Sequence, residues 1–127
     1  MNIEDVLFVS KHFEVGAHTH THFMPWEDKL DQMPSKIMVD EIALSRVILQ
    51  QVTGQPVNSF AWPFGYYRQA VLDILPILGF ESSTMVDNIS QNASGGNPMF
   101  ILRINVDGKC SASQVKSVLE SGKIATC

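Results

Sequence analysis

The chain has 127 residues, of which 45% are hydrophobic and 17% charged, so we expect one domain over 1–127 with a single hydrophobic core. The formal net charge is -4 and no basic stripe occurs, which argues against a surface that neutralises nucleic-acid phosphates. No apolar run reaches the roughly 18 residues of a membrane span, and the acidic start is unlike a signal peptide, so the cellular location stays open.

The first predicted elements run from the start of the chain to a histidine-rich segment. Asn2 followed by Asp5 is typical of a helix-capping pair, and the apolar spacing after it predicts a helix from about 3 to 11. A short buried strand over 13–17 is expected next. Two prolines and several charges then indicate an exposed loop over 23–35.

A long helix is predicted over 36–52, ended by Gly54 and Pro56. Its buried face is expected to hold Ile42, Leu49 and Val52, broadened by Leu44 and Ile48. The segment 57–62 follows as a strand and is closed by Pro63 and Gly65.

The next predicted helix covers 67–78, and Gly79 fits its C-terminal cap. Pro76 lies inside this helix and should kink or shorten its last turn, because proline has no N–H to donate. The expected buried face consists of Val71, Leu72, Leu75 and Leu78.

Two further strands are predicted over 80–86 and 100–106, with a loop rich in Asn, Ser and Gly over 88–98 between them. A last helix is expected over 111–121, capped by Ser111. Strands alternating with helices are typical of an α/β fold with parallel strands, which places functional loops at the carboxyl ends of the strands.

Only two cysteines occur, Cys110 and Cys127, which is too few for a disulfide framework. A single bridge between them stays open as an alternative. Free thiols are the favoured prediction.

All four histidines fall near the start of the chain, at positions 12, 18, 20 and 22. Imidazole is the commonest metal ligand in proteins, and zinc in catalytic sites usually has three protein ligands and a water. His18 and His22 can converge on one ion if the chain turns between them, a turn that Thr19 and Thr21 can fix. In an extended chain His20 would share their face instead. A polar loop with solvated histidines is the alternative.

The segment 14–22, Glu-Val-Gly-Ala-His-Thr-His-Thr-His, resembles the second motif of the polysaccharide deacetylase (NodB homology) family, carbohydrate esterase family 4. The resemblance implies that His18 and His22 bind a divalent metal, with zinc as the first candidate, and that Thr19 braces their loop. It places His20 on a variable position.

A second segment, 59–67, Ser-Phe-Ala-Trp-Pro-Phe-Gly-Tyr-Tyr, resembles the third motif of this family. Ala61 stands where many members have the arginine that orients the catalytic aspartate, and the segment resembles the branch that includes deacetylases of poly-N-acetylglucosamine. The resemblance implies that the backbone N–H of Phe64 is an oxyanion donor. It also implies substrate-binding roles for Trp62, Pro63 and Tyr66, although core packing is the alternative for Trp62 and Phe64.

Other parts of the family pattern are missing. The first motif, Thr-Phe-Asp-Asp, supplies the third metal ligand and the general base, but this chain has no Asp-Asp pair. The Leu-x-x-His motif of the general acid is also absent. The segment 102–107 resembles the same branch, yet Asn105, at the matching position, cannot deliver a proton. Barrels of this kind have about 200 to 250 residues, so the resemblance implies a partial (β/α) barrel without its first strands.

Three explanations for the partial barrel stay open: truncation, a homo-oligomer that covers the open edge, or a separate protein that completes it. Asp28, Asp31 or Asp87 could replace the missing carboxylate, although loop acids are usually solvated. The implied activity is metal-dependent removal of N-acetyl groups from amino-sugar polymers. The alternatives are a truncated, catalytically inactive remnant that binds metal or carbohydrate, and a metal-storage or metal-sensing module.

Overall fold

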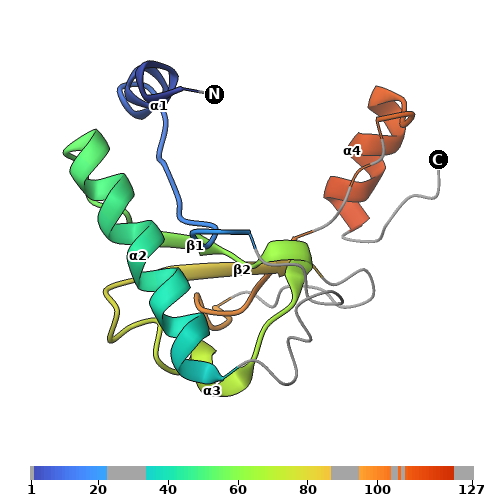
Figure 1. Ribbon diagram of the computed structural model, residues 1–127. Helices are drawn as coiled ribbons and strands as arrows, with labels where there is room; N and C mark the ends of the chain where they lie inside the picture. Colours follow the sequence, from blue (N-terminus) through green and yellow to red (C-terminus); the bar gives the residue numbers. More distant parts are fainter. Residues whose placement is uncertain (1, 23–33, 87–94, 104–105, 107, 122–127) are drawn as a thin grey trace.

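The computed structural model describes residues 2–22, 34–86, 95–103, 106 and 108–121. The elements in chain order are α1 (Ile3–Ser10), α2 (Ser35–Thr53), β1 (Ser59–Ala61), the 3-10 turn η1 (Pro63–Gly65), α3 (Gln69–Leu72), β2 (Ser82–Val86), β3 (Ile101–Arg103) and α4 (Ala112–Ser121). Figure 1 shows α2 lying along the sheet, with α1 and α4 farther out on opposite sides of the view. Among the described residues, no helix is long and apolar enough to cross a membrane.

The three strands form one parallel sheet in the order β1-β2-β3, so strands that follow each other in the chain are neighbours in space. The segment before the histidines joins the other edge of β1 through a parallel bridge between Ala17 and Phe60. Neighbouring parallel strands in chain order are typical of a (β/α) barrel, because each crossover returns to the next position in the sheet. The predicted fold class, a partial (β/α) barrel of the deacetylase type, is confirmed.

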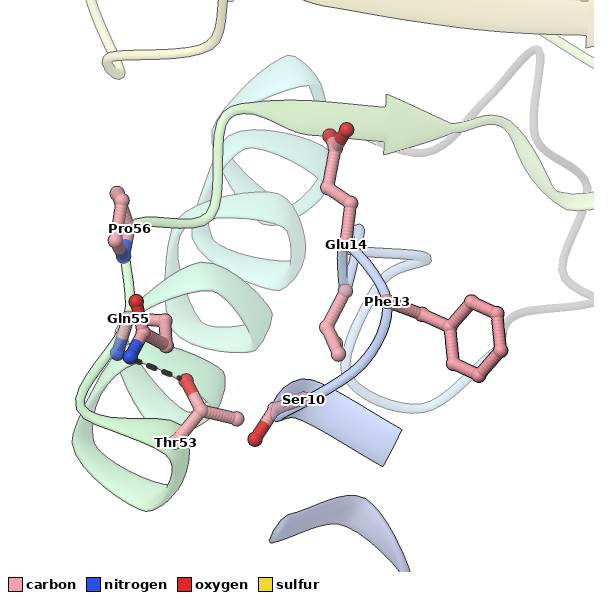
Figure 2. A pocket seen from close by; sticks show the side chains of 7 residues that line it. Ser10, Phe13, Glu14, Thr53, Gln55 and Pro56 are labelled. Carbon is pink, nitrogen blue, oxygen red and sulfur yellow. Dashed lines mark hydrogen bonds between the residues drawn. The ribbon is translucent and has the colours of Figure 1, made fainter. Parts of the chain in front are cut away.

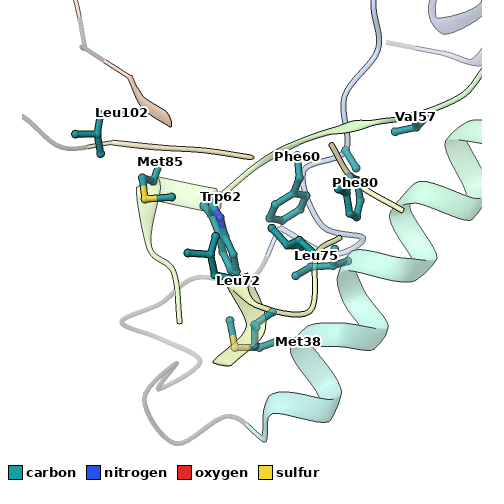
Figure 3. Close-up of a cluster of buried hydrophobic side chains, with 12 residues drawn as sticks. Met38, Val57, Phe60, Trp62, Leu72, Leu75, Phe80, Met85 and Leu102 are labelled. Atoms are coloured by element: carbon teal, nitrogen blue, oxygen red, sulfur yellow. The ribbon is translucent and has the colours of Figure 1, made fainter. Parts of the chain in front are cut away.

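The hydrophobic core fills the space between this sheet and α2, as Figure 3 shows. Its largest fully buried side chains include Trp62 and Phe60, whose rings meet edge to face with centroids 5.1 Å apart. The Trp62 indole Nε1 donates to Ser83 Oγ at 3.3 Å, which gives the buried N–H a partner. The third motif is therefore anchored in the centre of the core.

The helix caps predicted at Asn2, Gly54 and Ser111 are confirmed. Asn2 and Asp5 form a capping box, in which each side chain accepts a hydrogen bond from the other's backbone N–H. Gly54 ends α2 in the left-handed conformation, with φ of 66°. Ser111 caps α4 together with Gln114, whose side-chain oxygen accepts from Ser111 N at 2.8 Å.

The helix predicted over 67–78 is much shorter in the structure. Only α3 is α-helical, and turns of i→i+3 type follow it, such as Leu75 N donating to Leu72 O at 3.2 Å. Pro76 explains the difference, because it has no N–H to donate to Leu72 O and so cannot continue the helix. The prediction that this proline shortens the last turn was correct in kind but underestimated the effect.

Two further expectations need correction. The predicted strand over 13–17 is reduced to the single bridge at Ala17. On α2, Leu44 is 45% exposed, while Met38 and Ser45 take part in the buried face instead.

The predicted loops over 23–35 and 88–98 lie largely outside the described residues. Cys110 is disulfide-bonded, so the prediction of a free thiol at this position was wrong. Cys127 lies outside the described residues.

Candidate metal and substrate site

The two sequence motifs lie side by side at one end of the sheet. Ala17 N donates to Ser59 O, and Ala61 N donates to Ala17 O, both at 2.9 Å, so the strand-like segment before the histidines runs parallel to β1. The two segments then leave the sheet at their carboxyl ends. Parallel barrels carry their reactive loops at this end, so the fold brings the histidine segment 18–22 and the turn η1 together where a site is expected.

His18 has a fixed ring orientation. Its Nδ1 lies 2.6 Å from the backbone oxygen of Ala61. A carbonyl oxygen only accepts, so Nδ1 carries the proton and the neutral ring keeps its lone pair on Nε2. Histidines that bind metals usually donate their other ring N–H in this way, which fixes the tautomer and the direction of the free nitrogen.

His22 lies next to His18, with ring centroids 4.9 Å apart. The chain turns back between them, and both Thr19 (φ 65°) and His22 (φ 53°) adopt the left-handed conformation. Residues other than glycine in this region cost about 1–3 kcal/mol each, so their occurrence at both ends of a short turn requires support from the surroundings. The turn predicted between the two histidines is present.

Glu41 on α2 supplies part of that support. Its Oε2 accepts hydrogen bonds from His20 N at 3.0 Å, Thr21 N at 2.7 Å and Thr21 Oγ1 at 3.0 Å. The carboxylate thus contacts the middle of the turn, between its two left-handed residues. Hydrogen bonds to an ionised acceptor are roughly twice as strong as neutral ones.

The turn η1 completes the wall beside the histidines. Phe64 (φ 55°) and Gly65 (φ 77°) are both left-handed, and the Phe64 ring meets the His22 ring with centroids 5.1 Å apart. A Cβ on Gly65 would lie 2.9 Å from Val86 Cα and closer still to Val86 N, so only glycine fits against the end of β2. The Pro-Phe-Gly sequence therefore fixes an aromatic side chain against a predicted metal ligand.

The electrostatics favour a neutral imidazole at His18. Burial lowers the pKa of His18, since the charged ring loses solvation, whereas its hydrogen bond to Ala61 O acts in the opposite direction. Electrostatic interactions with His22 and Arg103 lower the pKa of His18 further. A neutral ring is the form that binds a metal ion.

Arg103, at the end of β3, brings a cation into this region. Its guanidinium donates to Trp62 O at 3.3 Å, and its Nε is buried without a hydrogen-bond partner among the described residues. Leaving a buried donor without a hydrogen bond costs free energy. The residue that carries this donor, Arg103, is positively charged and lowers the pKa of His18.

The structure separates the predicted substrate-binding residues into two groups. Trp62 and Pro63 are fully buried, so their side chains pack in the core, which is the alternative considered for Trp62. Tyr66 is 56% exposed and lines a hollow of about 380 Å³ with Phe64, Gly65, Tyr67 and Val86. The Phe64 side chain is 45% exposed, which excludes core packing.

The loop-bracing role of Thr19 stays a prediction. Its Oγ1 is buried and has no hydrogen-bond partner among the described residues. Thr21 and Glu41 make bracing contacts. Glu41 lies 20 residues further along the chain in a different element, and no spacing rule connects the two positions.

Within the described ranges, no group of three His, Cys, Asp or Glu side chains could hold a metal ion. The candidates for the missing carboxylate, Asp28, Asp31 and Asp87, lie outside those ranges, as does Asn105 at the position of the general acid. The two histidines do fit a metal. With about 2.1 Å from zinc to an imidazole nitrogen, two rings on one ion place their centroids about 5 Å apart. The 4.9 Å between the His18 and His22 ring centroids is therefore compatible with two imidazole ligands on one ion.

A second pocket, between the ends of α1 and α2, has a different character (Figure 2). It has a volume of about 190 Å³ and is lined by Ser10, Phe13, Glu14, Val15, Thr53, Gln55 and Pro56. Glu14 is its one ionisable side chain, and no histidine reaches it. The histidine loop is therefore the better candidate site.

Comparisons with known proteins agree on fold and family. A Streptococcus pyogenes deacetylase, solved in complex with acetate, superposes with a TM-score of 0.75 at 16% identity over 92% of this chain and 50% of that one. A polysaccharide deacetylase from Bacillus cereus gives 0.74 at 20% identity, over 92% of this chain and 36% of that one. A putative polysaccharide deacetylase from Bacillus anthracis gives 0.70 at 20% identity with the same coverage.

These identities support the fold alone, and the chain spans half or less of the length of these solved proteins. None of the curated proteins matches this sequence. The family is shown by the sequence itself, because residues 7–83, which include both motifs and the strands that carry them, match the polysaccharide deacetylase family model. The chain belongs to the polysaccharide deacetylase family.

Proposed function

We propose that this chain carries the metal-binding part of a hydrolase that removes N-acetyl groups from an amino-sugar polymer. The observation that carries the proposal is the paired arrangement of His18 and His22. The Nδ1 of His18 donates to Ala61 O, which directs Nε2 away from β1, and the centroids of the His18 and His22 rings lie 4.9 Å apart. Family membership supplies the reaction class.

His18 and His22 would hold a divalent metal, with zinc as the first candidate because imidazole suits it well. When bound, such an ion acts as a Lewis acid that polarises a carbonyl oxygen. The third ligand and the general base would come from a carboxylate-bearing segment outside the described residues. That segment could belong to the same polypeptide, to a second copy of the chain or to another protein.

The chain's own groups have separate roles in this proposal. His18 and His22 would hold and orient the metal ion. The backbone N–H of Phe64 would donate a hydrogen bond to the acetamide oxygen as negative charge develops on that oxygen. Tyr66 borders the hollow next to Phe64 and offers an exposed aromatic face to a sugar ring. The reaction adds water to the acetyl carbon, breaks the C–N bond, and releases acetate and a protonated amine.

A second candidate function is a catalytically inactive remnant that binds metal or carbohydrate. The observation in its favour is that, among the described residues, no third side chain completes a metal site with the histidine pair. Binding and turnover therefore have to be measured separately.

The test measures zinc stoichiometry of the purified chain by elemental analysis, together with acetate release from N-acetylglucosamine oligomers. We expect about one zinc per chain in the wild type, in line with one two-histidine site completed by water or another ligand. His18→Ala and His22→Ala should each abolish binding. His12→Ala is the matched control, because His12 is exposed and lies beside α1, where it contacts Phe8 O.

The outcomes distinguish the two functions. Acetate release that depends on both histidines supports the hydrolase. Stoichiometric zinc without acetate release, even after a Thr-Phe-Asp-Asp segment is supplied, supports the inactive remnant. Zinc binding that survives both histidine substitutions would refute the site itself. A His20→Ala variant that loses zinc would move one ligand to the central histidine.

A further inference from the structure

Glu41 and the histidine loop are connected by an unusual concentration of hydrogen bonds. A single carboxylate oxygen, Glu41 Oε2, accepts from two consecutive backbone N–H groups and from one hydroxyl. All three donors belong to His20 and Thr21.

The contact lies where the loop conformation is decided. The left-handed residues Thr19 and His22 flank the two residues that Glu41 holds. If the loop were extended, the side chains of His18 and His22 would lie on one face of the chain but far apart in space. In the turned form the centroids of the two rings lie 4.9 Å apart.

A purely structural role for Glu41 explains less. Its neighbour Asp40 makes an exposed i,i+4 ion pair with Lys36, the usual arrangement for an acid on a helix surface. Glu41 is partly buried and faces the loop rather than a helix cation. Its contacts reach across 20 and 21 residues of sequence, so they act on the loop and not on α2.

We propose that Glu41 is a positioning residue for the metal-binding loop: its carboxylate holds the 18–22 turn closed, so that His18 and His22 are paired before a metal ion arrives. Glu41 does not touch the metal. Preformed ligands bind more tightly, since the loop does not have to be ordered on binding. This inference rests on the proposed metal site for its functional consequence, but the loop-holding contact can be tested without any metal.

The metal-free test is amide hydrogen exchange, measured by NMR on the full chain. Glu41→Ala should accelerate exchange of the His20 and Thr21 amides by about tenfold, the factor that corresponds to losing one net hydrogen bond. Glu41→Gln should give a smaller effect, because the amide oxygen can still accept but has lost its charge. Asp40→Ala is the matched control and should leave both amides unchanged.

The metal test measures the zinc Kd of the same variants by competition with a chelator. Loss of an outer-shell partner typically weakens metal binding 10- to 100-fold, so Glu41→Ala should fall in about that range. Glu41→Gln should recover part of the affinity, and Asp40→Ala should match the wild type. Thr21→Val, which removes only the hydroxyl contact, should weaken zinc binding less than Glu41→Ala.

Unchanged amide exchange in a folded Glu41→Ala variant would overturn the proposal. So would a zinc Kd equal to that of the wild type. If Glu41→Ala does not fold, Glu41→Gln and Thr21→Val carry the test, and wild-type values for both variants would again overturn it. If the wild-type chain binds no zinc, the proposed function fails, whereas the exchange result still decides whether Glu41 holds the turn.

Discussion

The two motifs of the site lie in contact but are held by different forces. The turn η1 follows β1 and is anchored by the buried Trp62 and by the close approach of Gly65 to the end of β2. The histidine loop lies mostly at the surface, and its turn depends on hydrogen bonds to Ala61 O and to Glu41. One motif is fixed by core packing and the other by a few polar contacts.

Because of this difference, substitutions in the two motifs should change different properties. Substitutions in the turn should change the free energy of unfolding, because they alter buried groups. Substitutions in the loop should leave the fold largely intact and change ligand affinity, because surface hydrogen bonds contribute little to global stability. The sharpest tests compare a residue of one motif with a matched residue elsewhere.

The largest effect is expected for Gly65→Ala. A methyl group there meets the Val86 backbone at under 3 Å and also demands a left-handed alanine, so we expect a loss of at least about 3 kcal/mol in unfolding free energy. Gly54→Ala is the matched control, because Gly54 is equally left-handed (φ 66°) but has open space around it. There the cost should be about 1–2 kcal/mol. Urea denaturation measures both, and equal losses would contradict the steric explanation.

Trp62→Ala should follow, with a loss of about 3–5 kcal/mol for emptying a fully buried aromatic site. Tyr66→Ala, four residues along the chain and 56% exposed, should change unfolding by no more than about 0.5 kcal/mol. The same urea experiment applies. If Trp62→Ala left stability unchanged but weakened oligosaccharide binding, the assignment of this side chain to the core would be wrong.

The stabilisation of the chain by zinc should depend on the histidine loop more than on the turn η1. A ligand that binds only the folded chain stabilises it by about 2.7 kcal/mol at 100 times its Kd, so zinc should raise the wild-type Tm measurably. The rise should vanish in His18→Ala and His22→Ala and persist in His12→Ala. Before zinc is added, the Tm values of all these variants should lie close to that of the wild type. A large loss of Tm in metal-free His22→Ala would mean that the loop is part of the core after all.

The sequence was most informative where local chemistry decides the structure. Caps such as Asn2 and Gly54 depend on one or two residues, and they were predicted with the right partners. The parallel order of the strands followed from their alternation with helices. Both motifs were also found from the sequence, because each occupies a short continuous segment.

Contacts between distant segments could not be predicted. Nothing in the pattern of α2 distinguishes Glu41 from the exposed Asp40 beside it, since their difference arises only when the helix packs next to the loop. For the Trp62 side chain the sequence left two alternatives open, substrate binding, which the resemblance implies, and core packing. Its burial depends on which face of β1 turns toward α2, and a strand of three residues carries too little alternation to fix that face.

The smallest effect concerns protonation of His18 in the metal-free chain. Burial keeps the pKa of His18 below its ordinary value of 6.5, so the folded state favours the neutral ring. The unfolded chain then binds the proton more readily, and stability contributed by this group is complete above 6.5 and declines as the pH falls through the range below it. NMR titration of the ring should give a lower pKa for His18 in the folded chain than in urea. An equal pKa in the folded chain would show that this ring is solvated, whereas a higher pKa would show that the hydrogen bond to Ala61 O outweighs burial.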